Sequence, residues 1–156
     1  MRCIVKTIES AGRAEVFRII PLGDAHLGSV ACDERLLRVK IAYIRDTPNC
    51  WWIGMGDMAD SIGRIDPRYR EAAYAKWLQG TDRVFKRQKD YLIELLQPIG
   101  PRCLCYLKGN HEDHIETKYS SDLYLDVVEG IRPTEDVDIA MGLSGFLVLK
   151  FPRHRG

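Results

Sequence analysis

The chain has 156 residues and is 46% hydrophobic, which suits one globular domain with its own core. Its formal net charge of +1 at pH 7 gives no overall signal for a nucleic-acid or membrane partner, and no apolar stretch is long enough to span a bilayer. Five cysteines without a CxxC pair, and an N-terminus without a signal-peptide pattern, favour a soluble cytoplasmic protein with reduced thiols.

Two strands are expected near the N-terminus, at residues 2–8 and 14–20. The glycine-containing segment Ser10–Arg13 between them is typical of a hairpin turn. Proline cannot donate to a sheet ladder, so we expect the second strand to end or bulge at Pro21.

The segment Asp33–Arg45 predicts an amphipathic helix, because Leu37, Ile41 and Ile44 fall on one stripe of a helical projection. The Pro-Asn pair that follows should break the chain before a strand at Cys50–Ile53.

Residues 62–90 predict a basic helical insert. Tyr69–Leu78 should form a short helix, and a longer helix capped by Thr81 or Asp82 should run as far as Pro98. Basic and aromatic side chains alternate through the insert: Arg64, Arg68, Tyr69, Arg70, Tyr74, Lys76, Trp77, Arg83, Lys86, Arg87 and Lys89. Such a mixture can bind a phosphate backbone and stack on bases, although a solvated helix face covering a site has the same composition.

The C-terminal third predicts a strand at Cys103–Leu107, whose two cysteines we expect to be small buried residues. Helical turns should follow at Ile115–Tyr119 and Leu123–Val128, the second ending at Gly130, before a last strand at Phe146–Phe151. The resulting order β-β-α-β-α-β-α-β predicts a single α/β domain over residues 1–156 with a largely parallel sheet.

Three polar clusters each follow an apolar run that is typical of a buried strand. They are the sequences Gly-Asp-Ala-His at 23–26, Gly-Asp-Met-Ala-Asp at 56–60 and Gly-Asn-His-Glu at 109–112. The carboxyl ends of parallel strands meet at one edge of an open α/β sheet, which is where ligands bind. The clusters therefore predict a metal site that handles phosphate.

The first two clusters supply carboxylate and imidazole ligands. In an extended segment Asp24 and His26 point the same way, so both can reach one cation. The Asp57 carboxylate has two oxygens and can bridge two cations. Either cluster alone is weak, since a lone D-x-H pair is more often a surface ion pair and acidic residues are common at helix N-termini.

The third cluster adds an amide and a second imidazole. Asn110 offers a neutral carbonyl oxygen that suits a second cation sharing Asp57. His111 is a good general acid for a leaving alkoxide, and Asp60 is the candidate carboxylate that would hold its tautomer. Asn110 could instead serve as a helix N-cap with Glu112 in the first turn. We assign neither of the other histidines to a metal; one is at position 114, on the following helix, and the other is at 154.

Residues 54–59 also fit the dinucleotide fingerprint G-x-G-x-x-[G/A]. The residue after the second glycine is Asp57, however, and its carboxylate would repel a pyrophosphate unless a metal intervened. We therefore disfavour a dinucleotide site.

Taken in order, the clusters resemble the first three signature motifs of the calcineurin-like metallophosphoesterases, D-x-H, G-D-x-x-D and G-N-H-[E/D], and look particularly like the phage and bacterial members. The resemblance covers roughly residues 15–151. It implies a four-layer α/β/β/α sandwich with two divalent metals at one edge of the sheets. Carried over position by position, it implies that the metal ligands are Asp24, His26, Asp57 and Asn110, and that His111 is catalytic and oriented by Asp60.

The family pattern continues with three more histidines, which this sequence does not supply after Phe151. We therefore expect the chain to be the N-terminal part of a longer protein, with an incomplete sandwich made of the first sheet and its helices. The missing part would carry the last metal-ligand histidines.

The function expected from the clusters and the resemblance is a metal-dependent phosphomonoesterase or phosphodiesterase. The mixed nitrogen and oxygen ligands favour manganese, with iron or zinc as alternatives. Two other functions stay open, a catalytically incomplete metal-binding or interaction module and a nuclease-like enzyme that binds nucleic acid through the basic insert.

Overall fold

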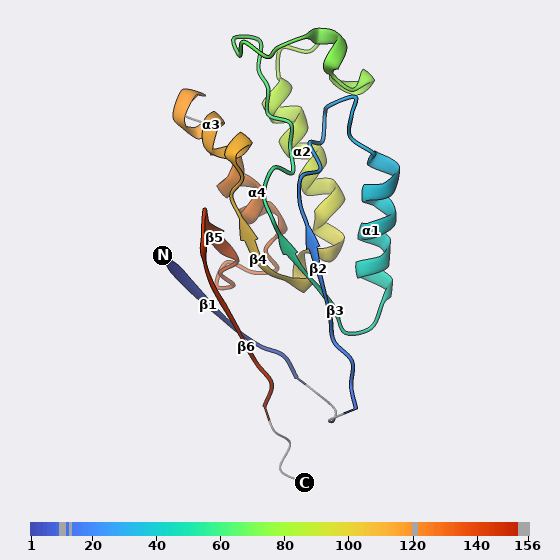
Figure 1. Ribbon diagram of the computed structural model, residues 1–156, viewed down its shortest axis with the longest axis vertical. Coiled ribbons are helices and arrows are strands. Elements are labelled where there is room, and N and C mark those ends of the chain that lie inside the picture. Colours follow the sequence, from blue (N-terminus) through green and yellow to red (C-terminus); the bar gives the residue numbers. More distant parts are fainter. Residues whose placement is uncertain (10–11, 13, 120–121, 153–156) are drawn as a thin grey trace.

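The computed structural model describes residues 1–9, 12, 14–119 and 122–152 (Figure 1). The described strands are β1 (Arg2–Thr7), β2 (Arg18–Leu22), β3 (Cys50–Gly54), β4 (Cys103–Leu107), β5 (Ala140–Gly142) and β6 (Gly145–Lys150). The α-helices are α1 (Glu34–Asp46), α2 (Val84–Leu96), α3 (Asn110–Tyr119) and α4 (Leu123–Ile131). Short 3₁₀ turns lie at Glu71–Ala73, Lys76–Leu78 and Gln97–Arg102.

The main sheet is parallel and has the strand order β2-β3-β4-β5. Each strand returns to the sheet through helical segments, as parallel pairing requires. Helices α1, α2 and α4 pack against one face of this sheet, as Figure 1 shows. The α/β class and the parallel sheet predicted from the sequence are therefore confirmed.

The predicted hairpin is wrong. Strand β1 pairs in parallel with β6 in a separate two-stranded sheet, whereas β2 pairs with β3. Pairing with the far end of the chain prevails over local turn chemistry because it buries Ile4 against Cys105 and Met141 of the main sheet. The predicted turn at Ser10, Ala11 and Arg13 lies outside the described residues.

Pro21 neither ends nor bulges its strand, because the ladder of β2 with β3 continues through Pro21 to Leu22. Among the described strands β2 has β3 as its single neighbour. Proline is tolerated on such an edge strand because its missing N–H faces no partner.

The helix predicted at Asp33–Arg45 is confirmed as α1, with Leu37, Ile41 and Ile44 buried. Asp33 is the N-cap, since its side chain accepts a hydrogen bond of 2.8 Å from the Leu36 N–H.

The short helix predicted at Tyr69–Leu78 is wrong, because the segment contains two 3₁₀ turns separated by extended backbone. The segment forms hydrogen bonds with the loop at residues 28–30 instead of within itself. Val30 N–H donates to the Ala73 carbonyl, and Ala75 N–H donates to the Gly28 carbonyl, each at 2.8 Å. These cross-links replace the bonds of a helix that would be marginal at this length.

The longer helix of the insert is present as α2, and its N-cap is Arg83 rather than Thr81 or Asp82. Helix α4 continues through Gly130 to Ile131, so Gly130 does not end it. Gly130 lies so close to α2 that an added Cβ would come within 2.7 Å of the Ile93 side chain. The short strand β5 had no counterpart in the prediction.

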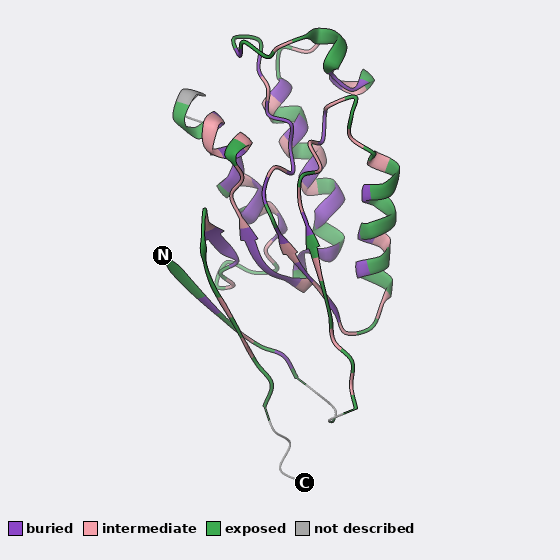
Figure 2. Cartoon of the chain, viewed as in Figure 1, coloured by how far each residue is buried: buried purple, intermediate pink, exposed green. Residues whose placement is uncertain are grey.

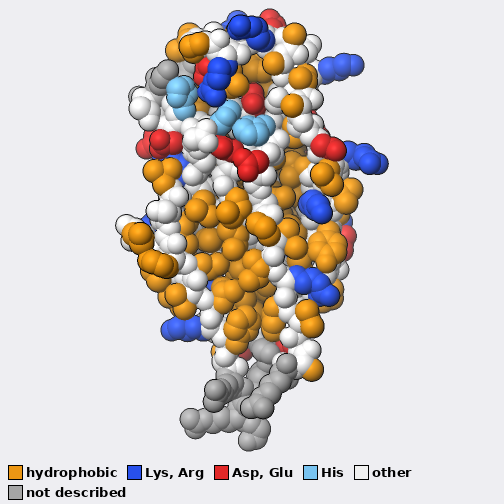
Figure 3. Space-filling model, in the orientation of Figure 1, with side chains coloured by type: hydrophobic (Ala, Val, Ile, Leu, Met, Phe, Trp, Pro, Cys, Tyr) orange, Lys and Arg blue, Asp and Glu red, His pale blue; other side chains and the backbone are white. Residues whose placement is uncertain are grey.

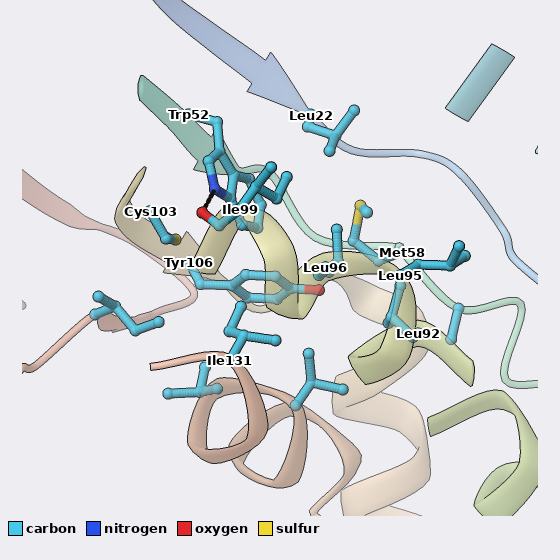
Figure 4. Packing of buried hydrophobic residues seen from close by; sticks show 14 of the residues in the cluster. Leu22, Trp52, Met58, Leu92, Leu95, Leu96, Ile99, Cys103, Tyr106 and Ile131 are labelled. Atoms are coloured by element: carbon cyan, nitrogen blue, oxygen red, sulfur yellow. Dashed lines mark hydrogen bonds between the residues drawn. The ribbon is translucent and has the colours of Figure 1, made fainter. Parts of the chain in front are cut away.

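The core lies between the main sheet and its helices, where Figure 2 shows most of the buried residues. Trp52 of β3 is fully buried and donates from Nε1 to the Ile99 carbonyl at 2.7 Å (Figure 4). Its ring makes an edge contact with that of Tyr106. Cys103 and Cys105 are buried as predicted, and burial raises the pKa of both thiols.

Candidate metal centre

The three polar clusters follow β2, β3 and β4, at the carboxyl edge of the main sheet. We call residues 23–28, 55–61 and 108–109 the edge loops. In Figure 3, histidine and acidic side chains gather in a band on this side of the molecule, above a broad apolar face. The position is the one that the sequence predicted from parallel strands.

Main-chain hydrogen bonds join the first two edge loops side by side. Asp24 N–H donates to the Gly56 carbonyl at 3.1 Å, and His26 N–H donates to the Asp57 carbonyl at 3.0 Å. Leu27 N–H continues the series to the Met58 carbonyl at 2.8 Å. The two loops thus extend the parallel ladder beyond the ends of their strands.

The second and third edge loops lie in close contact at two glycines, Gly56 and Gly109. A Cβ on Gly56, which has φ +82°, would lie 2.5 Å from the Gly109 nitrogen. A Cβ on Gly109 would lie 2.2 Å from both the main-chain nitrogen and Oδ1 of Asp57. Side chains at either position would separate the loops, so the glycines permit the three clusters to converge.

Asp24, His26 and Asp57 form one possible cation site. Each offers a ligand atom, and these atoms all lie within 4.8 Å of one another. All three residues have positive φ, of 50°, 47° and 50° respectively. The first segment is therefore not extended, as the sequence suggested, but held in a left-handed conformation that costs of order 1 kcal/mol or more per residue.

A second possible cation site shares His26 with the first. It contains His26, Asp60 and His111, whose ligand atoms also lie within 4.8 Å of one another. The Asp60 Oδ1 is 3.8 Å from His26 Nδ1, and the two histidine rings make an edge contact. Burial raises the pKa of the Asp60 carboxyl, and the nearby His111 and His26 oppose that rise.

His111 is held at two points. Its main-chain N–H donates to Asp57 Oδ1 at 2.8 Å, and its Nδ1 contacts the main-chain carbonyl of Asp60. The sequence assigned this orienting role to the Asp60 carboxylate, whereas the contact at Nδ1 is with the Asp60 carbonyl. Nδ1 must then carry the proton, which leaves Nε2 available for proton transfer.

Glu112 is the residue of this region whose role the sequence reasoning missed. Its buried carboxylate accepts hydrogen bonds from the N–H groups of Gly109, Asp57 and Met58, at 3.0, 2.9 and 2.9 Å. Burial raises the pKa of Glu112, and the bond from the Asp57 N–H opposes the rise. Its position in the sequence could have indicated this role, because a glutamate three residues after a helix N-cap, here Gly109, typically accepts a hydrogen bond from the N–H of the cap.

Asn110 is the first residue of α3 rather than its cap, and it is exposed. It lines a surface depression of about 480 Å³ together with Asp66, Pro67, Arg68 and His114, which we call the Arg68 depression. Its role as a ligand to a second cation stays a prediction. His154 lies outside the described residues.

The aromatic side chains of the insert pack within the fold. Tyr74 is buried and donates from its hydroxyl to the Ile62 carbonyl at 2.5 Å, and its ring contacts that of Tyr69. Trp77 donates from Nε1 to Glu34 at 2.7 Å. These contacts favour a structural role for the three rings over base stacking.

Comparisons of the chain with protein-family models, with characterised proteins and with solved structures give no match. Within the described residues, no helix has both the length and the apolar character needed to cross a membrane.

Proposed function

We propose that this chain is a metal-dependent phosphoester hydrolase of the calcineurin-like type. The observation that carries the proposal is the convergence of Asp24, His26 and Asp57, whose ligand atoms lie within 4.8 Å of one another at the carboxyl edge of a parallel sheet. Each of the three has a positive φ, and residues held in such conformations cluster at ligand sites.

The donor set fits a divalent cation. Two carboxylates and an imidazole offer the mixed oxygen and nitrogen ligands that manganese, iron and zinc accept, with manganese our first choice. The Asp57 carboxylate uses Oδ1 for the His111 N–H, which leaves Oδ2 for a cation. A second cation would require Asp57 and Asn110, as the family resemblance implies. A cation held by His26, Asp60 and His111 would instead occupy the His111 Nε2 that the proposed proton transfer needs.

Metal ions in such a site polarise a phosphoryl oxygen and lower the pKa of a bound water. The chain's own contribution is proton transfer and positioning. The contact of His111 Nδ1 with the Asp60 carbonyl fixes the ring, so that Nε2 can give a proton to the leaving alkoxide oxygen.

The second layer of the proposed sandwich has partial support. Strands β1 and β6 lie against the main sheet through Ile4, Leu147 and Met141, in a cluster that is separate from the helix-covered core. The complete α/β/β/α arrangement remains part of the proposal.

Asp57→Asn tests the function directly. The asparagine carbonyl can still accept the His111 N–H, so the fold is retained while the ligand charge is lost. We expect Mn²⁺ affinity, measured by titration calorimetry, to fall at least about tenfold and hydrolysis of p-nitrophenyl phosphate and its bis-ester to fall about 100-fold. Asp46→Asn, at an exposed carboxylate on α1, is the matched control and should change neither.

Failure of the unmodified chain to bind Mn²⁺, Fe²⁺ or Zn²⁺ would refute the proposal. If the chain binds metal but hydrolyses neither ester, the result would support the alternative that it is a metal-binding module and not an enzyme. The nuclease-like alternative predicts oligonucleotide binding that weakens steeply with salt.

A further inference from the structure

The Arg68 depression adjoins the candidate metal centre but is not part of either group of metal-binding side chains. Asp66, Pro67 and Arg68 enter it from the insert, and Asn110 and His114 enter it from α3. His111, which belongs to the second group, follows Asn110 directly in the chain. A ligand that reaches the metal centre over the start of α3 would therefore meet this depression.

A buried carboxylate fixes the position of the Arg68 guanidinium. The Asp66 side chain is only 3% exposed and accepts three bonds from Arg68, from the main-chain N–H at 2.8 Å, from Nε at 3.0 Å and from Nη2 at 2.9 Å. Such a two-pronged bond sets the plane of the guanidinium as well as its place.

The same carboxylate lies close to α3, where the buried Nε2 of His114 has no hydrogen-bond partner among the described residues. His114 Nε2 is 3.5 Å from Asp66 Oδ2, and His114 lies one helical turn after His111. Asp66 thus lies between the arginine and the helix that carries the candidate general acid.

The guanidinium keeps donors for a ligand. The bonds to Asp66 use Nε and Nη2, so within the described part of the chain no bond occupies Nη1. The Arg68 side chain is half exposed, and its charge is close enough to act on the Asp60 carboxyl. Arginine in this setting is suited to phosphate oxygens, which match its planar fork.

The neighbouring basic side chains of the insert are engaged elsewhere. Arg64 pairs with Asp82 at 2.9 Å and Lys86 pairs with Asp90 at 2.5 Å, both on exposed surface. Arg70 donates to the main-chain carbonyl of Tyr69 at 2.6 Å. None of these three lines the depression.

We propose that Arg68, positioned by Asp66, anchors a phosphate group of the substrate by donating from Nη1 to its non-bridging oxygens, in the depression that Asn110 and His114 also line. This inference rests on the proposed hydrolase function and adds the residue that recognises the substrate. The phosphate could be the scissile group or a neighbouring phosphate of a longer substrate, since both present the same oxygens.

The first test is binding of inorganic phosphate in the presence of Mn²⁺, measured by titration calorimetry. The variant Arg68→Gln combined with Asp66→Asn removes both charges together, so no buried carboxylate is left unpaired. We expect phosphate affinity to fall about tenfold, as for the loss of one charge-assisted hydrogen bond, while Mn²⁺ affinity is unchanged. Arg68→Lys keeps the positive charge but loses the planar guanidinium, so its affinity for phosphate should lie between those of the unmodified chain and the double variant.

Arg64→Gln is the matched control, because it removes an equal charge four residues away, from a side chain that pairs with Asp82 and does not line the depression. It should bind phosphate as the unmodified chain does. Circular dichroism and thermal melting of each variant verify that the fold is intact.

Steady-state kinetics then identify which phosphate is bound. If Arg68 binds the scissile group, the charge-neutral double variant should raise KM for p-nitrophenyl phosphate about tenfold with kcat changed less than about threefold. If it binds a neighbouring phosphate, only a dinucleotide with a 5′-phosphate should show the rise in KM.

If the double variant and the unmodified chain bind phosphate equally well, with Mn²⁺ binding intact, Arg68 is not the phosphate anchor, and the proposed hydrolase function is unaffected. If the unmodified chain does not bind Mn²⁺, the proposed hydrolase function itself is refuted. No phosphate binding by the metal-loaded unmodified chain would also refute the role of Arg68.

Discussion

The helix-covered face of the main sheet and the edge loops at its carboxyl end are held by different forces. The face is apolar, and its side chains, such as Trp52, Leu92 and Leu96, are fully buried in regular strands and helices. The edge loops are held by main-chain hydrogen bonds, close glycine contacts and the Glu112 carboxylate, with several residues at positive φ. Stability should therefore depend mainly on the face, and ligand binding mainly on the loops.

The comparison predicts its largest effect at Trp52. Trp52→Ala would leave a cavity between sheet and helices and an unpaired Ile99 carbonyl, so we expect unfolding to become easier by about 3–5 kcal/mol. Urea denaturation followed by circular dichroism measures this change. Val39→Ala, on the exposed side of α1, should change stability by no more than about 0.5 kcal/mol.

A Trp52 variant as stable as the Val39 variant would mean that burial on this face is not what holds the fold. A Trp52 variant that stays folded should keep its Mn²⁺ affinity, because the edge loops have their own contacts.

Glu112 tests this difference most directly, because it is buried like a core residue yet binds the edge loops from the first turn of α3. Glu112→Gln places an amide NH₂ against main-chain donors that need an acceptor, so we expect a loss of about 2 kcal/mol in unfolding free energy. Mn²⁺ affinity should fall as well, since the bond to the Asp57 N–H positions a candidate ligand.

Glu116→Gln on the same helix is the control for Glu112→Gln. Glu116 is partly exposed and pairs with Lys108, so its loss should cost no more than about 1 kcal/mol. If both variants behave alike, the edge loops are held without Glu112.

The sequence predicted the helix-covered face well because its signals are local. Apolar stripes such as that of α1, and the five-residue run at Cys103–Leu107, determine the element by their period and length. The pairing of β1 with β6 could not be read in this way, because it joins residues more than 140 positions apart and the local signal favoured a hairpin.

For the candidate site, the order of the polar clusters indicated that residues of the three clusters would lie close together, but not how each side chain is held. Asp24, His26 and Asp57 lie together because their backbone is left-handed, a conformation that sequence periodicity does not reveal. The contact of His111 with the Asp60 carbonyl depends on main-chain positions in two loops, so residue types alone assigned it to the carboxylate instead.

The smallest predicted effect on stability is at Asp66. This residue bears on the difference between the two regions because it stabilises a loop through an ion pair and is not part of the apolar core. The bonds from Arg68 hold the pKa of Asp66 well below the ordinary value of 3.8. The His114 imidazole also faces this carboxylate, with Nε2 at 3.5 Å from Oδ2. Since the folded-state pKa is depressed, this stabilisation is complete above about pH 5 and is lost progressively as the pH falls below 3.8. Solvent screens the half-exposed guanidinium, so we expect the contribution to be about 1 kcal/mol.

Urea denaturation between pH 3 and pH 6 measures the Asp66 contribution. The unmodified chain should lose more stability over this range than Asp66→Asn, and the difference between the two curves should close toward the acid end. Parallel curves would show that the ion pair does not stabilise the fold. In that case the fixed position of Arg68 would have to come from the backbone of the insert, and the charge-neutral double variant would report only the loss of the guanidinium.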